Sequence, residues 1–227
     1  MPAITVIGIG FKPLDKRAAE TLERSAMILA SSRLYDVFRG YSEFERAAKK
    51  IRVIDSIDDT LAVIRNNYRT CSVALLASGD PMFFGIGRRV IEEFGKDSVE
   101  LFPDLSSIQA AFARVKEPWD NAFLMSLHRG PYPEKRRSLA YDTTDIPALL
   151  QNHPVVAVLT DTEKNPVVIA EVLSLSPLTR AAELLMYVCE RLGSAEERVT
   201  EGTPVQIAHM AFSEPNVVII KHIGNGQ

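Results

Sequence analysis

Short apolar runs alternate with longer stretches in which apolar residues recur every three or four positions. Near-continuous apolar runs are typical of buried parallel strands, and the longer spacing is typical of amphipathic helices. In the first half of the chain the runs predict strands at 3–9, 27–30, 51–54, 72–77 and 99–102. Helices are expected at 16–26, after Ser31, after Ser56, after Pro81 and at 105–115. The strand at 72–77 has the pattern of a central strand.

The pattern changes after Val115, where residues 116–120 include Pro118 and Trp119. This break predicts two domains, with boundaries at 1–116 and 121–227. The second half is expected to contain strands at 122–127, 154–159, 183–189 and 217–221, helices at 166–173 and 204–211, and an irregular loop at 128–143. Strands alternate with helices in both halves, which predicts the α/β class.

Composition narrows the possible function classes. Of the 227 residues 46% are hydrophobic and 24% charged, as in ordinary soluble domains, and the net charge is −3. Without a basic excess no nucleic-acid partner is expected. No apolar run approaches the roughly 20 residues that span a bilayer, and no signal peptide is seen, so we expect a cytoplasmic protein without a membrane partner. The two cysteines lie far apart and no Cys/His cluster has metal-ligand spacing, so no metal is expected.

A glycine pair, Gly8-Ile9-Gly10, follows the first predicted strand. It begins like the dinucleotide-binding fingerprint, but Pro13 stands at the third glycine position, which disfavours a nicotinamide or flavin site. Two interpretations stay open. The pair forms a tight turn, or it lets a flat ligand approach the backbone.

The segment Ser78-Gly79-Asp80-Pro81 follows the predicted central strand, at the end of the strand where open α/β sheets bind ligands. Asp80 and Pro81 would suit the N-cap and first position of a helix, which is a purely structural interpretation. The functional interpretation is that Gly79 allows close backbone approach and that Asp80 faces a cationic ligand group. Ser106 and Ser107 present the same choice after the strand at 99–102. No G-x-S-x-G motif occurs and His128 has no triad partner, which disfavours a serine hydrolase.

Five segments together resemble one known family over nearly the whole chain. They are residues 4–10, 77–87 and 103–113, Leu159-Thr160-Asp161 and Glu190-Arg191-Leu192-Gly193. On these segments the chain resembles the tetrapyrrole (corrin/porphyrin) methyltransferases. The resemblance implies a two-domain fold that binds S-adenosylmethionine (SAM) in the interdomain cleft, and a homodimer.

The resemblance also implies the residues of the site. SAM is expected to contact Phe11, Ser78, Gly79, Asp80, Phe83, Ser106, Ser107, Thr160 and Leu192. The substrate would be a precorrin-type tetrapyrrole with many carboxylates, for which Arg33, Arg129 and Lys164 are candidate ligands. Methyl transfer to a ring carbon depends mainly on alignment, so no single catalytic residue is expected.

Within that family the chain looks most like the enzymes that methylate C-5 of a (cobalt-)precorrin in cobalamin biosynthesis. The features that carry this are Phe-Phe-Gly-Ile-Gly at 83–87, Trp119-Asp120 before Ser126-Leu127-His128, and Asn165-Pro166 after the Leu-Thr-Asp segment. A separate subunit that methylates C-15 and decarboxylates is then an expected partner.

The chain departs from the usual family pattern at two places. Phe11-Lys12 stands where the family usually has Pro-Gly, and Asp104 stands where it usually has Gly. Asp104 adds a negative charge near the expected SAM site and would oppose a positive φ there. These departures support one alternative, a catalytically altered protein that binds SAM or a tetrapyrrole. Another alternative is a methyltransferase of the same fold that acts on a different target.

Overall fold

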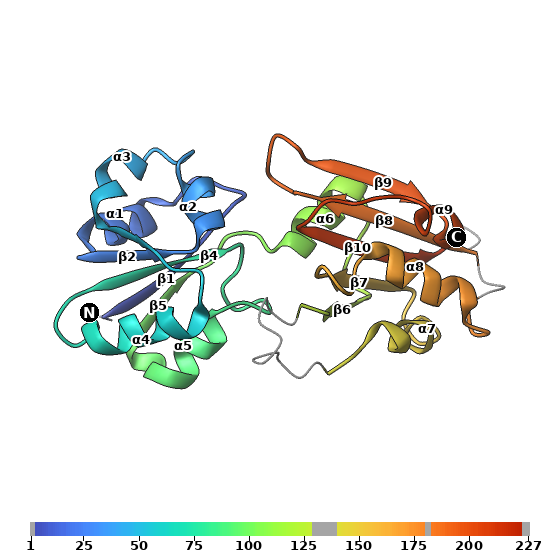
Figure 1. Cartoon of the computed structure of the whole chain (residues 1–227), viewed down its shortest axis with the longest axis horizontal. Coiled ribbons are helices and arrows are strands. Elements are labelled where there is room, and N and C mark those ends of the chain that lie inside the picture. Colours follow the sequence, from blue (N-terminus) through green and yellow to red (C-terminus); the bar gives the residue numbers. More distant parts are fainter. Residues whose placement is uncertain (1–2, 129–139, 180–182, 224–227) are drawn as a thin grey trace. The chain divides into compact units, whose positions relative to one another are not determined.

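A computed structural model describes residues 3–128, 140–179 and 183–223 of the chain. The chain divides into two compact units, Met1–Ser106 and Ser107–Gln227, each built on a five-stranded sheet (Figure 1). The expected α/β class is confirmed. The division lies one helix earlier than the break in the sequence pattern, because α6 (Ser107–Val115) contacts β7 (Val155–Leu159) and β10 (Asn216–His222) of the second unit.

The first unit contains a parallel sheet. Its strands are β1 (Ile4–Ile9), β2 (Met27–Ala30), β3 (Ile51–Val53), β4 (Val73–Ser78) and β5 (Val99–Phe102), in the order β3-β2-β4-β1-β5. Every residue of β1 and β2 is buried, and so is all of β4 except Ser78. Burial on both faces explains why these strands are near-continuous apolar runs. As predicted, β4 is the middle strand.

Helices cover both faces of this sheet (Figure 1). One face carries α1 (Lys16–Arg24), α2 (Ser32–Phe38) and α3 (Phe44–Ala47), and the other carries α4 (Ile57–Asn67) and α5 (Gly87–Phe94). Ser31 and Ser56 cap α2 and α4 as predicted, since their hydroxyls accept the N–H groups of Leu34 and Asp59. The connections after β1 and β4 lead to opposite faces, an arrangement that leaves room for a ligand at the carboxyl ends of these strands.

The helix expected at Pro81 begins only at Gly87, so Asp80 is not its N-cap. The Asp80 carboxylate instead accepts the N–H of Met82 at 2.8 Å, and Gly87 N–H donates to Pro81 O at 2.8 Å. A β-carbon at Gly85 would lie 2.6 Å from Pro81 O, so the segment folds back closely on itself. Its glycines disfavour a helix and permit this tight loop.

The second unit contains a mixed sheet. Its strands are β6 (Ala122–Ser126), β7, β8 (Leu184–Glu190), β9 (Arg198–Gly202) and β10, in the order β6-β7-β10-β8-β9. Strands β6 and β7 are parallel, whereas β10 runs antiparallel to both β7 and β8. Strand β9 pairs antiparallel with β8 at the sheet edge and was not predicted. It is mostly exposed, and its sequence Arg-Val-Thr-Glu-Gly has no apolar run.

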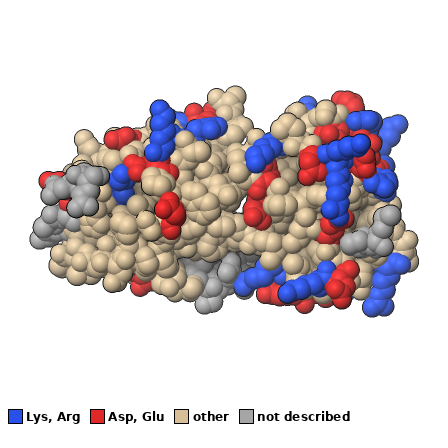
Figure 2. Space-filling model, turned by 180° about the vertical axis from the view of Figure 1, so that it is seen from behind, with Lys and Arg blue, Asp and Glu red and all other residues tan. Residues whose placement is uncertain are grey.

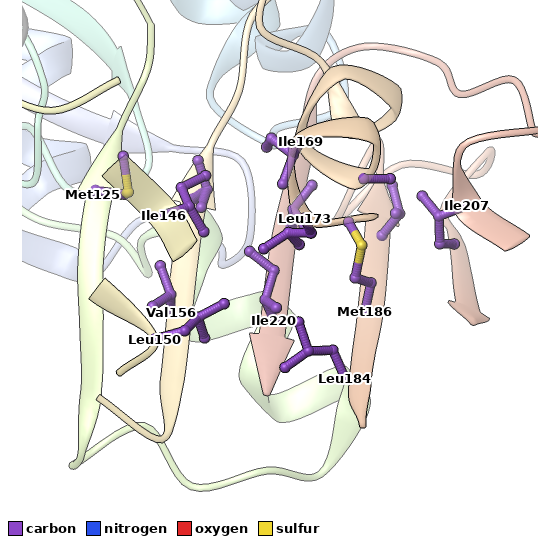
Figure 3. Packing of buried hydrophobic residues seen from close by; sticks show 14 of the residues in the cluster. Met125, Ile146, Leu150, Val156, Ile169, Leu173, Leu184, Met186, Ile207 and Ile220 are labelled. Atoms are coloured by element: carbon purple, nitrogen blue, oxygen red, sulfur yellow. The ribbon is translucent and has the colours of Figure 1, made fainter. Parts of the chain in front are cut away.

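The core of the second unit lies between its sheet and three helices (Figure 3). These are α7 (Ile146–Leu149), α8 (Pro166–Leu175) and α9 (Pro204–Ile207), and α9 is shorter than predicted. Ile169 and Leu173 of α8 lie in one buried cluster with Met186 and Ile220 of the strands. Short 3-10 turns complete the elements at Ala48–Lys50, Lys96–Ser98 and Thr143–Asp145. The loop predicted at 128–143 falls mainly outside the described residues.

Charges of both signs are interspersed on the face drawn in Figure 2, in keeping with the small net charge. Among the described residues, no helix is long and apolar enough to cross a membrane. In the same part of the chain, no group of three or more His, Cys, Asp or Glu side chains is placed to hold a metal ion.

The two cysteines differ in burial, which predicts different reactivity. Cys189 in β8 is fully buried, and burial raises the pKa of its thiol to about 12, whereas Cys71 is half-buried. At pH 8 only about one Cys189 in ten thousand is then a thiolate. We expect a chromogenic disulfide reagent to titrate one thiol in the native protein and two after denaturation. Cys71→Ser should abolish the native signal, and equal native rates for both thiols would contradict the fold.

Candidate functional site

Three turns meet at the carboxyl edge of the first sheet, where β4, β1 and β5 lie side by side. Gly79 N–H, after β4, donates to Ile9 O at the end of β1 over 2.9 Å. Asp104 N–H, after β5, donates to Gly79 O over 3.4 Å. The turn after β4 is therefore hydrogen-bonded to the end of β1 and to the turn after β5. We call this group of turns the β4-β1-β5 edge.

The close approach at this edge depends on two missing side chains. A β-carbon at Gly8 would lie 1.9 Å from Gly79 O and 2.7 Å from Asp104 N. A β-carbon at Gly79 would lie 2.6 Å from Leu105 O, and Gly79 also has φ +60°, which L-residues adopt at a cost. Both positions thus require glycine.

The structure gathers several of the residues expected to contact SAM at this edge. Ser78 ends β4 and is exposed, Asp80 is half-buried, and Ser106 is buried beside Gly79. Phe11 lies on the turn after β1, linked through its N–H to Asp104. Two further residues expected to contact SAM follow these turns in the sequence. Phe83 packs edge-on against Phe84, with 4.9 Å between the ring centroids, and Ser107 is the first residue of α6.

Side chains hold the backbone of the turn after β1. Gly10 N–H donates to the Tyr41 hydroxyl at 2.7 Å. Phe11 N–H and Lys12 N–H donate to Asp104 Oδ2 at 2.7 and 3.2 Å. Sequence reasoning missed Tyr41, because it lies 31 residues away and belongs to no motif.

Burial raises the pKa of Tyr41, and the charges of Asp104 and Glu43 raise it further, against a lowering by the Gly10 hydrogen bond. The hydroxyl therefore stays protonated and neutral at physiological pH.

Asp104 does not need the positive φ that Gly would permit. The described non-glycine residues with positive φ are Phe84, Lys116 and Arg191.

A pocket of about 270 Å³ opens beside Asp104. Buried apolar side chains from β1, α1 and β5 form part of its wall, and charged and apolar residues of the turns form the rest. Its lining residues are Ile7, Gly8, Lys12, Pro13, Leu14, Asp15, Ala18, Phe102, Pro103 and Asp104. The pocket belongs entirely to the first unit.

Two expected SAM contacts share one edge of the second sheet. Thr160 follows β7 and Leu192 follows β8, at the end where β10 begins between these strands. The Thr160 hydroxyl donates to Asn216 at the start of β10, with 3.0 Å to its backbone O. Arg191 N–H donates to Pro215 O at 2.8 Å, which ties the turn after β8 to the same place. Sequence reasoning missed Asn216, which is buried although polar.

A carboxylate also holds the turn that contains Leu192. Glu197 Oε2 accepts Gly193 N–H at 2.7 Å, and the same carboxylate pairs with Arg114 of α6. The hydrogen bond from Arg114 holds the pKa of Glu197 below its usual range, with a smaller contribution from Gly193. The turn is thus anchored to α6 through one ionised side chain.

The three candidate substrate ligands differ in their surroundings. Arg33 lies in the first turn of α2. The residue is exposed as a whole, yet burial lowers the pKa of its guanidinium, and no carboxylate pairs with it in the described part of the chain. Lys164 is largely buried and its Nζ forms an ion pair with Asp142. Arg129 lies outside the described residues.

Comparisons with known proteins agree on one family. A sequence model of the family described as Tetrapyrrole (Corrin/Porphyrin) Methylases matches residues 3–208. A cobalt-precorrin-7 C(5)-methyltransferase from Salmonella typhimurium is 31% identical over 153 residues, 67% of each chain. A probable cobalt-precorrin-7 C(5)-methyltransferase from Methanocaldococcus jannaschii is 25% identical over 95% of this chain and 96% of its own.

A longer relative and a solved structure complete the comparison. A precorrin-6Y C(5,15)-methyltransferase (decarboxylating) from Sinorhizobium sp is 30% identical over 88% of this chain, which spans 44% of that protein. The crystal structure of a cobalamin biosynthesis precorrin-6Y methylase from Archaeoglobus fulgidus superposes with a TM-score of 0.63 at 23% identity, covering 96% of this chain and 97% of that one. This likeness shows that the two proteins share a fold.

The requirement for glycine at position 79 can be tested by comparison with Gly95, which also has a positive φ but has no neighbouring atom that a β-carbon would meet. Gly79→Ala adds strain at φ +60° and a collision with Leu105 O, whereas Gly95→Ala adds strain at φ +80° with no atom within 4 Å. Gly95 has φ +80° and ψ +150°, a region open essentially to glycine alone, so we expect Gly95→Ala to cost about 1–3 kcal/mol of unfolding free energy. Gly79→Ala should cost at least about 1 kcal/mol more, measured by urea denaturation. Equal losses would show that the turns are not in close contact.

The Asp142–Lys164 pair predicts a pH-dependent stability. The hydrogen bond from Lys164 holds the pKa of Asp142 below its usual range. The ionised carboxylate therefore stabilises the fold above about pH 4 and ceases to do so as the pH falls through its folded pKa. Asp142→Asn should destabilise the protein at pH 7 by less than about 1 kcal/mol, because the pair is partly exposed, and by less still at pH 3.

The partner substitution supplies the control for this pair. Lys164→Met should cause a similar loss at pH 7, and Asp142→Asn should then add little to it. Additive losses in the double variant, measured by thermal unfolding, would contradict a pairwise interaction.

Proposed function

We propose that this chain, which belongs to the family of tetrapyrrole (corrin/porphyrin) methylases, uses SAM to methylate C-5 of a (cobalt-)precorrin in cobalamin biosynthesis. The observation that carries the proposal is the match to two cobalt-precorrin-7 C(5)-methyltransferases, one of them along nearly the whole of both chains. The family match covers both units of the fold, from residue 3 to residue 208.

The β4-β1-β5 edge has features that suit SAM. Gly10 has φ +133°, and a β-carbon there would meet no atom within 4 Å, so the backbone is open to a ligand. Ser78 is exposed and Asp80 is half-buried. These two residues place a hydroxyl and a carboxylate on either side of Gly79, which has no side chain. A carboxylate in such a partly desolvated place favours a cationic sulfonium. The expected participation of Thr160 and Leu192, on the second sheet, stays a prediction.

Alignment is the main task left to the protein in this reaction. SAM when bound supplies a methyl group on a good leaving group, and an electron-rich ring carbon acts as the nucleophile. Holding the two at attack distance contributes about 7–11 kcal/mol, whereas a general base adds only about 10²–10⁴-fold. Turns that are hydrogen-bonded to one another, as at the β4-β1-β5 edge, suit this task because they hold a ligand in one orientation.

The substrate's carboxylates require cations on the protein. Arg33 has no carboxylate partner among the described residues, and burial lowers the pKa of its guanidinium. A substrate carboxylate would supply the missing counter-charge in a bidentate contact. Lys164 already neutralises Asp142 and would have to exchange this partner for the substrate. We therefore propose Arg33 as the first of the three candidates to test.

The longer Sinorhizobium relative suggests which activity a partner protein would supply. Its name combines C-5 and C-15 methylation with decarboxylation, and this chain matches less than half of its length. We propose that this chain supplies the C-5 activity and that a separate subunit supplies the C-15 activity. A homodimer and a cytoplasmic location belong to the same proposal.

The alternative is a catalytically altered protein that binds SAM or a tetrapyrrole. This alternative is supported by Phe11-Lys12 and Asp104, which differ from the residues that the family usually has at these positions. A methyltransferase with another target is a further alternative within the same fold.

A methylation assay separates these possibilities. Incubated with SAM and cobalt-precorrin-7, the protein should add a single methyl group to the macrocycle, detected by mass spectrometry. Arg33→Ala should raise the KM for the macrocycle by about tenfold and leave SAM affinity unchanged. Arg39→Ala, which removes another exposed arginine of the α2 end, is the matched control and should change neither. SAM binding without methyl transfer would favour the altered protein and overturn the enzyme proposal.

A further inference from the structure

The carboxylate of Asp104 joins two turns of the β4-β1-β5 edge. Its Oδ2 accepts the N–H groups of Phe11 and Lys12 from the turn after β1, at 2.7 and 3.2 Å. Its Oδ1 accepts the N–H of the next residue, Leu105, at 2.7 Å. Three backbone donors from two segments of the chain thus converge on one side chain.

Little else holds the turn after β1. Lys12 and Pro13 are exposed and Phe11 is only half-buried, so side-chain packing contributes little to its position. Gly10, at the start of the turn, is held by Tyr41, which leaves Asp104 to hold the two residues that follow. Hydrogen bonds that a backbone N–H donates to a carboxylate are among the stronger kinds in proteins.

This contact explains why the two departures from the family pattern occur together. A proline at position 11 would have no N–H to donate, and a glycine at position 104 would have no carboxylate to accept one. The Phe11–Asp104 contact exists only because both residues differ from that pattern. The departures are therefore two halves of one interaction, which weakens them as signs of a damaged site.

We propose that Asp104 is a positioning residue that orders the turn at Phe11 and Lys12 before the methyl donor binds. It acts on the donor through the backbone of that turn rather than through its own charge. This inference rests on the proposed function, because it assigns the turn a place in SAM binding. Without the carboxylate, the turn would have to be ordered at the moment of binding.

The size of the effect follows from conformational entropy. Ordering the backbone of one residue weakens binding by about tenfold when the cost falls on the binding step. Asp104→Ala should therefore raise the dissociation constant and the KM for SAM by about 10- to 100-fold. The kcat at saturating SAM should change by less than about threefold, since the bound turn has the same conformation once ordered.

S-adenosylhomocysteine separates positioning from direct charge attraction. This product has the same adenosyl and amino-acid groups as SAM but a neutral thioether in place of the sulfonium. If Asp104 positions the turn, Asp104→Ala weakens both ligands by the same factor. If it attracts the sulfonium, the variant weakens SAM alone. Asp104→Asn adds a second criterion. Its single amide oxygen can still accept from Phe11 and Lys12 without a charge, whereas its NH2 group cannot accept from Leu105, so it should restore part of the affinity.

Asp15 supplies the matched control. It is an acidic residue of the same pocket, and its side chain caps α1 by accepting the N–H of Ala18. Asp15→Ser removes the charge and keeps the cap, since serine is also a good N-cap residue. This variant should keep the exchange protection of Phe11 and Lys12, because Asp104 and its hydrogen bonds are unchanged.

The experiment measures dissociation constants for both ligands by calorimetry in the wild type and the three variants, with amide hydrogen exchange of each free protein. We expect Asp104→Ala to lose exchange protection at Phe11 and Lys12 and to weaken both ligands equally, with Asp104→Asn between Asp104→Ala and the wild type. Loss confined to SAM, or unchanged protection in Asp104→Ala, would overturn the proposal. If the wild type binds neither ligand, the proposed function fails, and with it the role of the turn in binding, while the exchange data still report whether Asp104 holds the turn.

Discussion

The candidate site depends on backbone approaching backbone with no side chain between. At the β4-β1-β5 edge the carbonyl of Gly79 lies where a β-carbon of residue 8 would be, and the carbonyl of Leu105 lies close to where one of residue 79 would be. Such contacts allow the turns after three neighbouring strands to hydrogen-bond directly. Any larger residue at either glycine would separate the turns, and the polar groups that they carry would no longer share one place.

The strands of the first unit could be predicted because the physics of a covered parallel sheet is simple. Strands buried on both faces must be apolar throughout, as β1, β2 and β4 are, and hydroxyl caps mark helix starts at Ser31 and Ser56. The same reasoning failed after Asp80, where a favourable cap and proline were outweighed by glycines that let the chain fold back on Pro81. Strand β9 escaped prediction because an exposed edge strand needs no apolar pattern.

The site was predictable only in part. Motifs at the ends of strands located Gly79, Asp80 and Ser106, since a strand end can be recognised in the sequence. The anchors of these turns could not be found in this way. Tyr41 and Asn216 are far from their partners in sequence, and nothing local marks a hydroxyl or an amide that will meet a distant turn. Asp104 was noticed as an addition of charge, and only the fold shows that backbone N–H groups surround it.

The order of strands in the second sheet has a consequence for synthesis on the ribosome. Strand β10 lies between β7 and β8, yet it is the last of the five to be made. Until it emerges, β7 and β8 each have one border without a hydrogen-bonding partner, and unpaired strand borders promote aggregation. In the first sheet the strand inserted between earlier ones is β4, which lies between β2 and β1, and the last strand, β5, is then added at the outer side of β1. Because β10 pairs with both β7 and β8, its docking closes both unpaired borders in one step.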